Sequence, residues 1–239
     1  MSPSDLGVIL AISLAAGAFG AMLGLGGGII LVPALILLQG APRTEAVAAS
    51  VVSVIATSSA AAIAYVRDHY TDIRLGLILE TSTAVGAVGG ALLAGHLSDR
   101  LVAALFATLL VAAAVSLLRR RDEEAAVAIA SETPFLEGSY NALPAGETVS
   151  YGVVRLREGL AGGLLAGMVS AILGVGGGLV KVPLMVLRMG VPMRVAIATS
   201  NFMIGVTAVA TAVPYYAAGY VNPYLAAPCA LGVLIGART

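Results

Sequence analysis

Two glycine clusters are the residues of this chain best suited to bind a small anion. The cluster at 24–28 (Gly-Leu-Gly-Gly-Gly) stands four residues before Val32-Pro33, and the cluster at 174–178 (Gly-Val-Gly-Gly-Gly) stands equally before Val182-Pro183. Glycine interrupts a helix, and a half-helix that begins after the interruption directs free N–H groups and its positive dipole end toward an anion. The glycines that would line such a site are Gly26, Gly27, Gly28, Gly176, Gly177 and Gly178.

Close contact between helices is the alternative role for glycine clusters in a membrane. We favour an interruption, because the two clusters stand in register and each precedes a Val-Pro pair. A nucleotide-binding loop is excluded, since neither cluster is followed by Lys-Ser or Lys-Thr. The repeated interruption therefore predicts a transport site.

Thr199, Ser200 and Asn201 form a polar run in the second half of the chain, and Ser50 takes the place of Ser200 in the first half. Their hydroxyl and amide groups could donate hydrogen bonds to the sulfonyl or carboxyl oxygens of a substrate. The alternative is that they cap helices or form hydrogen bonds between helices. We weigh the two roles equally for the run and favour the structural role for Ser50.

Lys181 lies three residues after Gly178, where the first half has Leu31. A cation at membrane depth is costly and usually faces a cavity or a partner. We predict that Lys181 binds an anionic substrate or changes protonation during transport; extension of its side chain toward the membrane surface is the alternative. Glu80 could pair with Lys181 or carry a proton, although its nearness to Arg74 favours an interfacial position.

The elements that position these residues must lie in a membrane. Hydrophobic residues make up 59% of the chain and charged residues 11%, and the mean hydropathy is +0.99. Asp, Glu, Lys and Arg do not occur in 6–42, 46–66, 81–98, 101–118, 159–180 or 195–237. About 18 uncharged apolar residues can cross a bilayer. The composition predicts an all-α, polytopic membrane protein of about seven helices.

The glycines divide the longest apolar stretches. Residues 6–42 are too long for one crossing, so we expect a helix over 6–23, a break, and a second apolar piece over 29–39. The other expected segments are 46–66, 75–95, 101–118, 159–187 with a glycine break, 195–217 and 224–237.

The chain contains an internal duplication. Residues 16–50 align with 166–200 without a gap and are identical at 16 of 35 positions, including the glycine clusters and both prolines that follow. The same offset pairs Tyr65 with Tyr215. A four-residue deletion then pairs Gly86 with Gly232.

Three regions follow from the duplication. We expect residues 1–118 to form a first transmembrane repeat, 119–157 a polar linker, and 158–239 a second, incomplete repeat. Either the sequence is truncated or the last helix of this repeat is absent. The linker is expected to be cytoplasmic, because arginines gather at its ends (Arg119, Arg120, Arg121, Arg155 and Arg157). The halves run antiparallel if each holds an odd number of crossings, and the sequence leaves the parallel arrangement equally open.

Several classes of function are excluded. The chain shows no serine nucleophile motif and no His/Cys/acid cluster with metal spacing. We therefore expect that it is not an enzyme and that it binds neither a metal ion nor a cofactor. Cys229 is a single cysteine and is expected to pack in the interior. A nucleic-acid partner is also excluded, because no basic tract occurs.

The duplicated Gly-x-Gly-Gly-Gly-x-x-x-Val-Pro motif, with Ala-x-Ala-Thr-Ser at 196–200, resembles the TauE/SafE family of sulfite exporters and toluene-sulfonate-uptake-permease-like proteins. The resemblance covers the chain outside the linker. It implies a secondary transporter of the inner membrane with seven to nine helices, which moves sulfite, sulfonates or other small organic anions. The missing last helix and the unequal pair Ala49-Ser50 and Thr199-Ser200 depart from a symmetric pattern.

Our leading hypothesis is a secondary transporter of a small sulfur-containing oxyanion, with its site between the repeats and Lys181 supplying the balancing charge. The expected partners are the anion, a coupling proton or sodium ion, and the lipid bilayer; a homo-oligomer is possible. One alternative is a passive anion channel on the same scaffold. The other is a non-transporting membrane subunit that docks a partner of sulfur metabolism through the linker.

Overall fold

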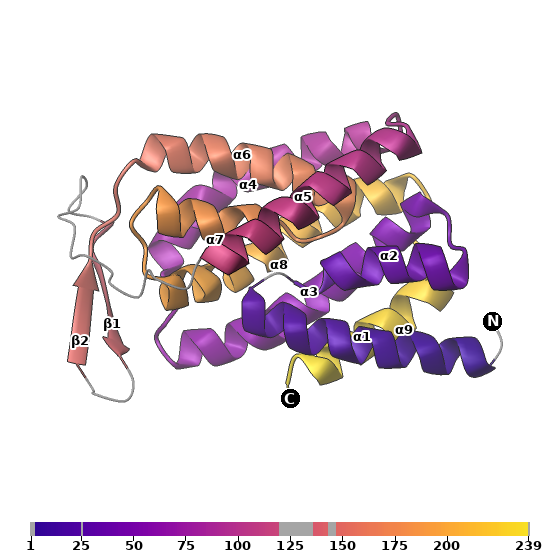
Figure 1. The fold of residues 1–239 in the computed structure, drawn as a ribbon, viewed down its shortest axis with the longest axis horizontal. Helices are drawn as coiled ribbons and strands as arrows, with labels where there is room; N and C mark the ends of the chain where they lie inside the picture. Colours follow the sequence, from indigo (N-terminus) through magenta and orange to yellow (C-terminus); the bar gives the residue numbers. More distant parts are fainter. Residues whose placement is uncertain (1–2, 25, 120–135, 143–146, 239) are drawn as a thin grey trace.

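The computed structural model describes residues 3–24, 26–119, 136–142 and 147–238, which form nine α-helices and one β-hairpin (Figure 1). The first half contains α1 (Pro3–Leu23), α2 (Gly28–Gln39), α3 (Arg43–Arg67), α4 (Ile73–Ala94) and α5 (Asp99–Arg119). The second contains α6 (Leu156–Leu173), α7 (Gly178–Leu187), α8 (Met193–Ala217) and α9 (Pro223–Gly236). Each apolar segment expected from the sequence holds a helix, and 159–187 holds two, on either side of its glycines.

Both glycine clusters interrupt the helices as predicted. Gly24, Gly26 and Gly27 have φ of 69°, 76° and 77°, and α2 begins at the next residue. Their counterparts in the second half have φ of 70°, 82° and 75°, and α7 begins directly after them. These left-handed conformations strain any residue with a Cβ atom, which explains why glycine recurs at these places.

Each interruption turns the chain back on itself. In Figure 1, α1 runs from the N-terminus toward the middle of the molecule, and α2 returns toward the same end. The α6–α7 pair does the same from the opposite end, where the β-hairpin lies. Corresponding helices of the two halves therefore run in opposite directions, which resolves the question of orientation that the sequence left open.

The halves are interleaved: α4 packs against α6, α1 against α9, and α3 against α8. A Cβ atom built on Gly86 would overlap the carbonyl oxygen of Leu164. A Cβ atom on Gly236 would overlap the carbonyl oxygen of Leu14. Both members of the second contact lie 150 positions from their counterparts in the first. The pairing of Gly86 with Gly232 through a deletion is therefore wrong; the offset of 150 continues without a gap, because the same backbone contact recurs.

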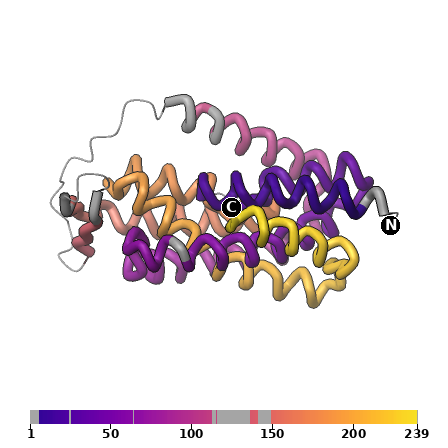
Figure 2. Tube along the Cα trace, turned by 90° about the horizontal axis from the view of Figure 1, so that it is seen from below, coloured from indigo at the N-terminus to yellow at the C-terminus, as the bar shows by residue number. Residues whose placement is uncertain are grey.

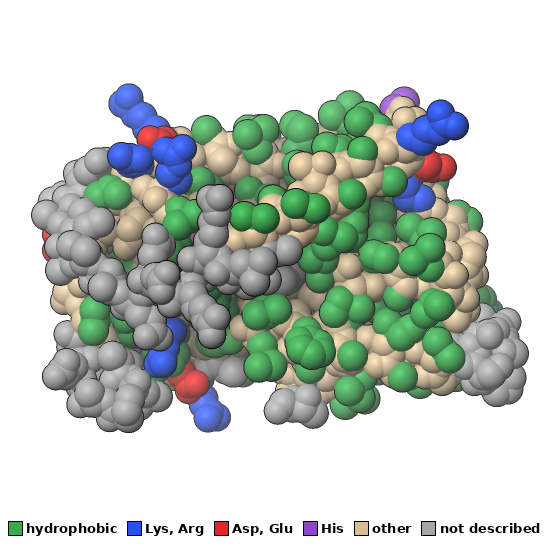
Figure 3. Space-filling view, in the orientation of Figure 1, with side chains coloured by type: hydrophobic (Ala, Val, Ile, Leu, Met, Phe, Trp, Pro, Cys, Tyr) green, Lys and Arg blue, Asp and Glu red, His purple; other side chains and the backbone are tan. Residues whose placement is uncertain are grey.

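The outer surface is that of a membrane protein. Five helices of the described residues (α1, α3, α4, α6 and α8) are long and apolar enough to cross a bilayer. Figure 3 shows hydrophobic side chains over the middle of the molecule and charged side chains at its two ends. Phe19 and Leu37 are 58% and 79% exposed, as lipid-facing residues can be. The chain is a multi-pass helical membrane protein; the number of about seven crossings stays a prediction.

The hairpin was not expected from the sequence. Strands β1 (Gly138–Ala142) and β2 (Glu147–Tyr151) pair antiparallel within the stretch interpreted as a polar linker. Residues 120–135 and 143–146 of that stretch lie outside the described residues. Helix α5 lies along the outside of the bundle in Figure 2 and has no counterpart among the described helices of the second half.

Candidate functional site

The two glycine breaks meet at the middle of the molecule and pack crosswise. A Cβ atom on Gly28 would overlap the carbonyl oxygen of Gly174, and one on Gly178 would overlap the carbonyl oxygen of Gly24. The first turn of each short helix therefore lies against the end of the opposite long helix. All six glycines predicted to line a site are buried at this crossing.

Ser50 and Ser200 hold the crossing together. Ser50 Oγ donates a hydrogen bond of 2.7 Å to the carbonyl oxygen of Gly174, and Ser200 Oγ donates one of 3.3 Å to that of Gly24. Both serines are fully buried. These bonds satisfy carbonyls that helix ends leave without a partner. The structural role favoured for Ser50 therefore holds for both serines in this conformation.

The two neighbours of Ser200 reach different parts of the molecule. Asn201 Nδ2 donates to the carbonyl oxygen of Ala21 at 3.2 Å, near the end of α1. Asn201 Oδ1 is buried without a hydrogen-bond partner. Thr199 Oγ1 accepts a 3.0 Å hydrogen bond from the N–H of Asp72, which caps α4. Asn201 thus leaves an acceptor oxygen unused in the interior.

The N-termini of α2 and α7 carry no side-chain cap. Each follows a left-handed glycine, Gly27 or Gly177, that makes no side-chain capping bond. Backbone bonds to these two glycines begin with the N–H groups of Ile30 and Val180. The N–H groups of the first residues, Gly28 and Gly178, are thus the donors that a small anion could use. Because the opposite break packs directly on both, binding there requires the two helix pairs to move apart.

Lys181 and Glu80 form a buried ion pair. Lys181 Nζ lies 3.5 Å from Glu80 Oε2, and the two side chains are 2% and 5% exposed. This corrects the interfacial position favoured for Glu80 and the alternative that Lys181 extends to the membrane surface. Lys181 does not lie free at the crossing, because its charge is balanced by Glu80.

Two threonines complete this polar cluster. Lys181 Nζ donates to Thr207 Oγ1 at 2.6 Å, and Thr207 Oγ1 lies 2.7 Å from Glu80 Oε1. Thr83 Oγ1 donates to Glu80 Oε2 at 2.7 Å. Both threonines were missed at the sequence level. Thr83 could have been found, since it lies three residues after Glu80 on one helix face; Thr207 is 127 residues away and gives no such signal.

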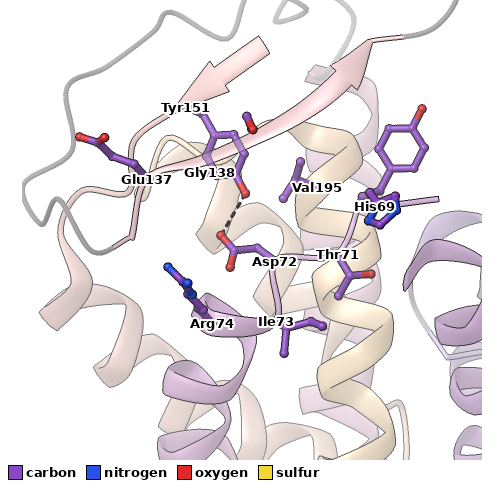
Figure 4. A pocket seen from close by; sticks show the side chains of 11 residues that line it. His69, Thr71, Asp72, Ile73, Arg74, Glu137, Gly138, Tyr151 and Val195 are labelled. Carbon is purple, nitrogen blue, oxygen red and sulfur yellow. Dashed lines mark hydrogen bonds between the residues drawn. The ribbon is translucent and has the colours of Figure 1, made fainter. Parts of the chain in front are cut away.

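A second polar region lies outside the bundle. A cavity of about 290 Å³ opens between the α3–α4 turn and the β-hairpin, lined by residues that include His69, Thr71, Asp72, Arg74 and Glu137 (Figure 4). The Tyr151 hydroxyl donates a 3.0 Å hydrogen bond to Asp72 Oδ2. Burial and the neighbouring Asp72 carboxylate both raise the pKa of Tyr151. None of these residues was predicted as a site; the expected sites lie in the membrane region.

Comparison with known proteins decides the family. The family model described as "Sulfite exporter TauE/SafE" matches residues 9–239. The chain belongs to the TauE/SafE family. A relative described as "Probable membrane transporter protein YunE", from Bacillus subtilis (strain 168), is 26% identical over 243 residues, which cover 97% of this chain and 85% of the relative. No solved structure matches.

TauE/SafE membership confirms the resemblance seen in the glycine motifs. The family is one of membrane transporters, so the chain is assigned to membrane transport and not to an enzyme class. Among the described residues, no group of three or more His, Cys, Asp or Glu side chains is placed to hold a metal ion.

Proposed function

We propose that this TauE/SafE protein is a secondary transporter of a small sulfur-containing oxyanion, such as sulfite or a sulfonate, driven by a gradient of protons or sodium ions. The observation that carries the proposal is the packing of the two glycine breaks on each other, at the uncapped starts of the half-helices α2 and α7. Half-helix N-termini that meet between antiparallel repeats are a recurring way to bind an anion in transporters.

The binding groups would come from both halves. The N–H groups at the starts of α2 and α7 would donate to the oxyanion, together with the hydroxyls of Ser50 and Ser200 and the amide of Asn201. Thr199 would not join them, because its hydroxyl oxygen is bonded to the N–H of Asp72 at the start of α4. Lys181 would balance the negative charge. In the conformation described, the two serines donate to Gly174 and Gly24 instead. Substrate would replace the carbonyls as their acceptor when the helix pairs separate.

Antiparallel repeats supply a natural route for alternating access. The α1–α2 pair opens toward one end of the molecule and the α6–α7 pair toward the other. The two helix pairs are equivalent in sequence at an offset of 150 residues. Movement of α1–α2 would expose the crossing to one side of the membrane, and the equivalent movement of α6–α7 would expose it to the other side. Such rocking around a fixed central site is the general mechanism of repeat transporters.

The end that carries the hairpin would be cytoplasmic. The ends of the membrane helices there carry Arg67, Arg74, Arg155, Arg157, Arg188 and Arg194, while the opposite end carries Arg43 and Arg100. Arginine enrichment on one side favours the cytoplasm for that side. This supports a cytoplasmic placement of residues 119–157, with the helices of both halves in the inner membrane.

A flux measurement in proteoliposomes tests the proposal. The purified intact chain is expected to transport sulfite or a sulfonate with saturable kinetics, and Lys181→Ala to reduce the flux. Glu158→Gln is a matched control, since Glu158 is half-exposed near the hairpin end and away from the crossing. Absence of flux for all such anions would contradict the proposal. Flux that neither saturates nor runs uphill under an ion gradient would favour the passive channel.

A further inference from the structure

The Lys181–Glu80 pair is not needed to build the fold. At an offset of 150 residues, Lys181 corresponds to Leu31 and Glu80 to Ala230. Leu31 is fully buried in an apolar cluster that first-half helices form with α9. The same place in the same architecture is therefore filled by apolar side chains.

A buried ion pair is a costly alternative to such packing. Desolvation of both charges offsets much of their attraction, and apolar replacements are often as stable or more so. The ion pair occurs at only one of two equivalent places in the fold, because Leu31 and Ala230 occupy the other. This difference between the halves indicates a role in transport for Lys181 and Glu80.

We propose that Glu80 carries the coupling proton and that its protonation releases Lys181 to the transported anion. The inference rests on the proposed function and names the coupling ion. A hydronium ion from the more acidic side gives its proton to one carboxylate oxygen of Glu80: one O–H bond of hydronium breaks, one O–H bond forms on Glu80, and the products are water and a neutral carboxylic acid. The ion pair is then lost, and Lys181 keeps an unbalanced positive charge that the anion neutralises.

The geometry allows the ammonium group of Lys181 to pair either with Glu80 or with the transported anion. The Lys181 N–H bonds to the carbonyl oxygen of Gly177 at 3.0 Å, so the residue belongs to the first turn of α7. Its Cε atom lies 3.3 Å from the position a Cβ atom on Gly177 would take. The lysine stem thus runs along the second glycine break. A change of side-chain rotamer would move the ammonium group from Glu80 toward the crossing.

Glu80 can hold the proton without losing its other contacts. Thr207 and Thr83 each lie 2.7 Å from one carboxyl oxygen, and hydroxyl groups can accept as well as donate a hydrogen bond. A neutral acid is therefore accommodated by the same threonines.

No other charged group competes for Glu80 among the described residues packed against it. Lys181 is the ionisable residue of α7. Helix α6 packs on this part of α4 through Gly163, and its ionisable residues, Arg157 and Glu158, lie in its first turn. On α8 the ionisable residues also lie near the helix ends: Arg194, Tyr215 and Tyr216. On α4 itself, Arg74 lies in the first turn. The proton on Glu80 is therefore coupled to Lys181.

The charge balance predicts the stoichiometry. The cluster is neutral when Glu80 pairs with Lys181, and it is neutral again when a protonated Glu80 and one monovalent anion are both present. One proton should therefore accompany each monovalent anion in the same direction. A pH gradient should drive uphill accumulation of the anion without a net movement of charge.

The test uses Glu80→Gln, whose amide resembles the protonated acid. Proteoliposomes are loaded at alkaline pH and placed at mildly acidic external pH, and the hydrogen sulfite concentration on each side is obtained from total sulfite and the pH of that side. The wild type is expected to concentrate hydrogen sulfite above its external concentration. Glu80→Gln is expected to exchange labelled sulfite across the membrane but not to concentrate hydrogen sulfite. Glu158→Gln serves as the control and should behave as wild type.

A second variant guards against misfolding. The double variant Glu80→Ala with Lys181→Leu reproduces the apolar residues of the first half and should fold, which its elution as a single species in detergent would show. It should also lose pH-driven accumulation. Accumulation driven by pH in either variant would overturn the inference. If the wild type moves no sulfite or sulfonate, the proposed function fails instead; sulfite flux that no pH gradient drives overturns the proton assignment alone.

Discussion

Ser50 and Gly174, which are 124 residues apart in the chain, are joined by a buried 2.7 Å hydrogen bond from the serine hydroxyl to the glycine carbonyl. The bond links a helix of the first half to the glycine break of the second. Ser200 and Gly24 repeat it in reverse at 3.3 Å. The two breaks are thus held together by one pair of reciprocal hydrogen bonds.

Removal of these hydroxyls should loosen the crossing. Ser50→Ala leaves a buried carbonyl without its donor, which typically costs about 1–3 kcal/mol of stability. Ser200→Ala should cost less, because its bond is longer. Thermal unfolding in detergent measures both. Ser59→Ala is a suitable control, since its exposed hydroxyl bonds within its own helix. Equal melting temperatures for all four proteins would contradict a locking role for the serines.

The glycines at the starts of α2 and α7 should tolerate no side chain. Gly28→Ala and Gly178→Ala each place a methyl group on a carbonyl oxygen of the opposite break, and overpacking of this kind costs about 1–3 kcal/mol or more. We expect both to lower the melting temperature and abolish anion flux.

Gly89→Ala provides the matched control for these glycines. A Cβ atom at Gly89 meets no atom within 4 Å, and the residue lies inside α4. Alanine there should stabilise the helix by about 0.5–1 kcal/mol. If Gly28→Ala retained wild-type stability and flux, the close crossing of the two breaks would be wrong.

The glycine breaks could be predicted from the sequence because their cause is local. Consecutive glycines before a Val-Pro pair supply the left-handed backbone that ends one helix and begins the next. The partner of each break could not be predicted, since Ser50 and Gly174 meet only after the halves interleave. The antiparallel orientation is a property of the same packing.

Glu80 shows why distance along the chain misled the sequence interpretation. Its separation of six residues from Arg74 suggested a shared position at the membrane surface. On a helix, six residues span about 9 Å. That is enough to leave Arg74 in the first turn of α4 while Glu80 is 4% exposed in the interior. The partner that explains its burial, Lys181, lies on another helix.

The ion pair should show strong coupling between its two residues. Lys181→Leu alone leaves Glu80 buried without its cation, and loss of one partner of a buried pair costs about 3–5 kcal/mol. The double variant Glu80→Ala with Lys181→Leu should recover most of that loss, because the equivalent residues Leu31 and Ala230 pack without charge. A double-mutant cycle on unfolding free energies measures the recovery. Strictly additive losses would show that the pair acts as two independent residues.

The contact between the hairpin and the bundle should depend on pH at the alkaline end. Burial and Asp72 raise the pKa of Tyr151 above its ordinary value of 10.0, so the folded protein holds the phenol proton more tightly than the unfolded chain does. The corresponding stabilisation is complete below pH 10.0 and is lost as the pH rises through the folded-state pKa. Tyr151→Phe removes the titrating group and the 3.0 Å hydrogen bond to Asp72. We expect the variant to be less stable near neutral pH and to lose less stability than the wild type above pH 10.0.

Melting temperatures of both proteins across that range measure the difference, with Tyr224→Phe as a control because Tyr224 is 81% exposed. Parallel pH profiles for wild type and Tyr151→Phe would mean that this hydroxyl does not anchor the hairpin to α4.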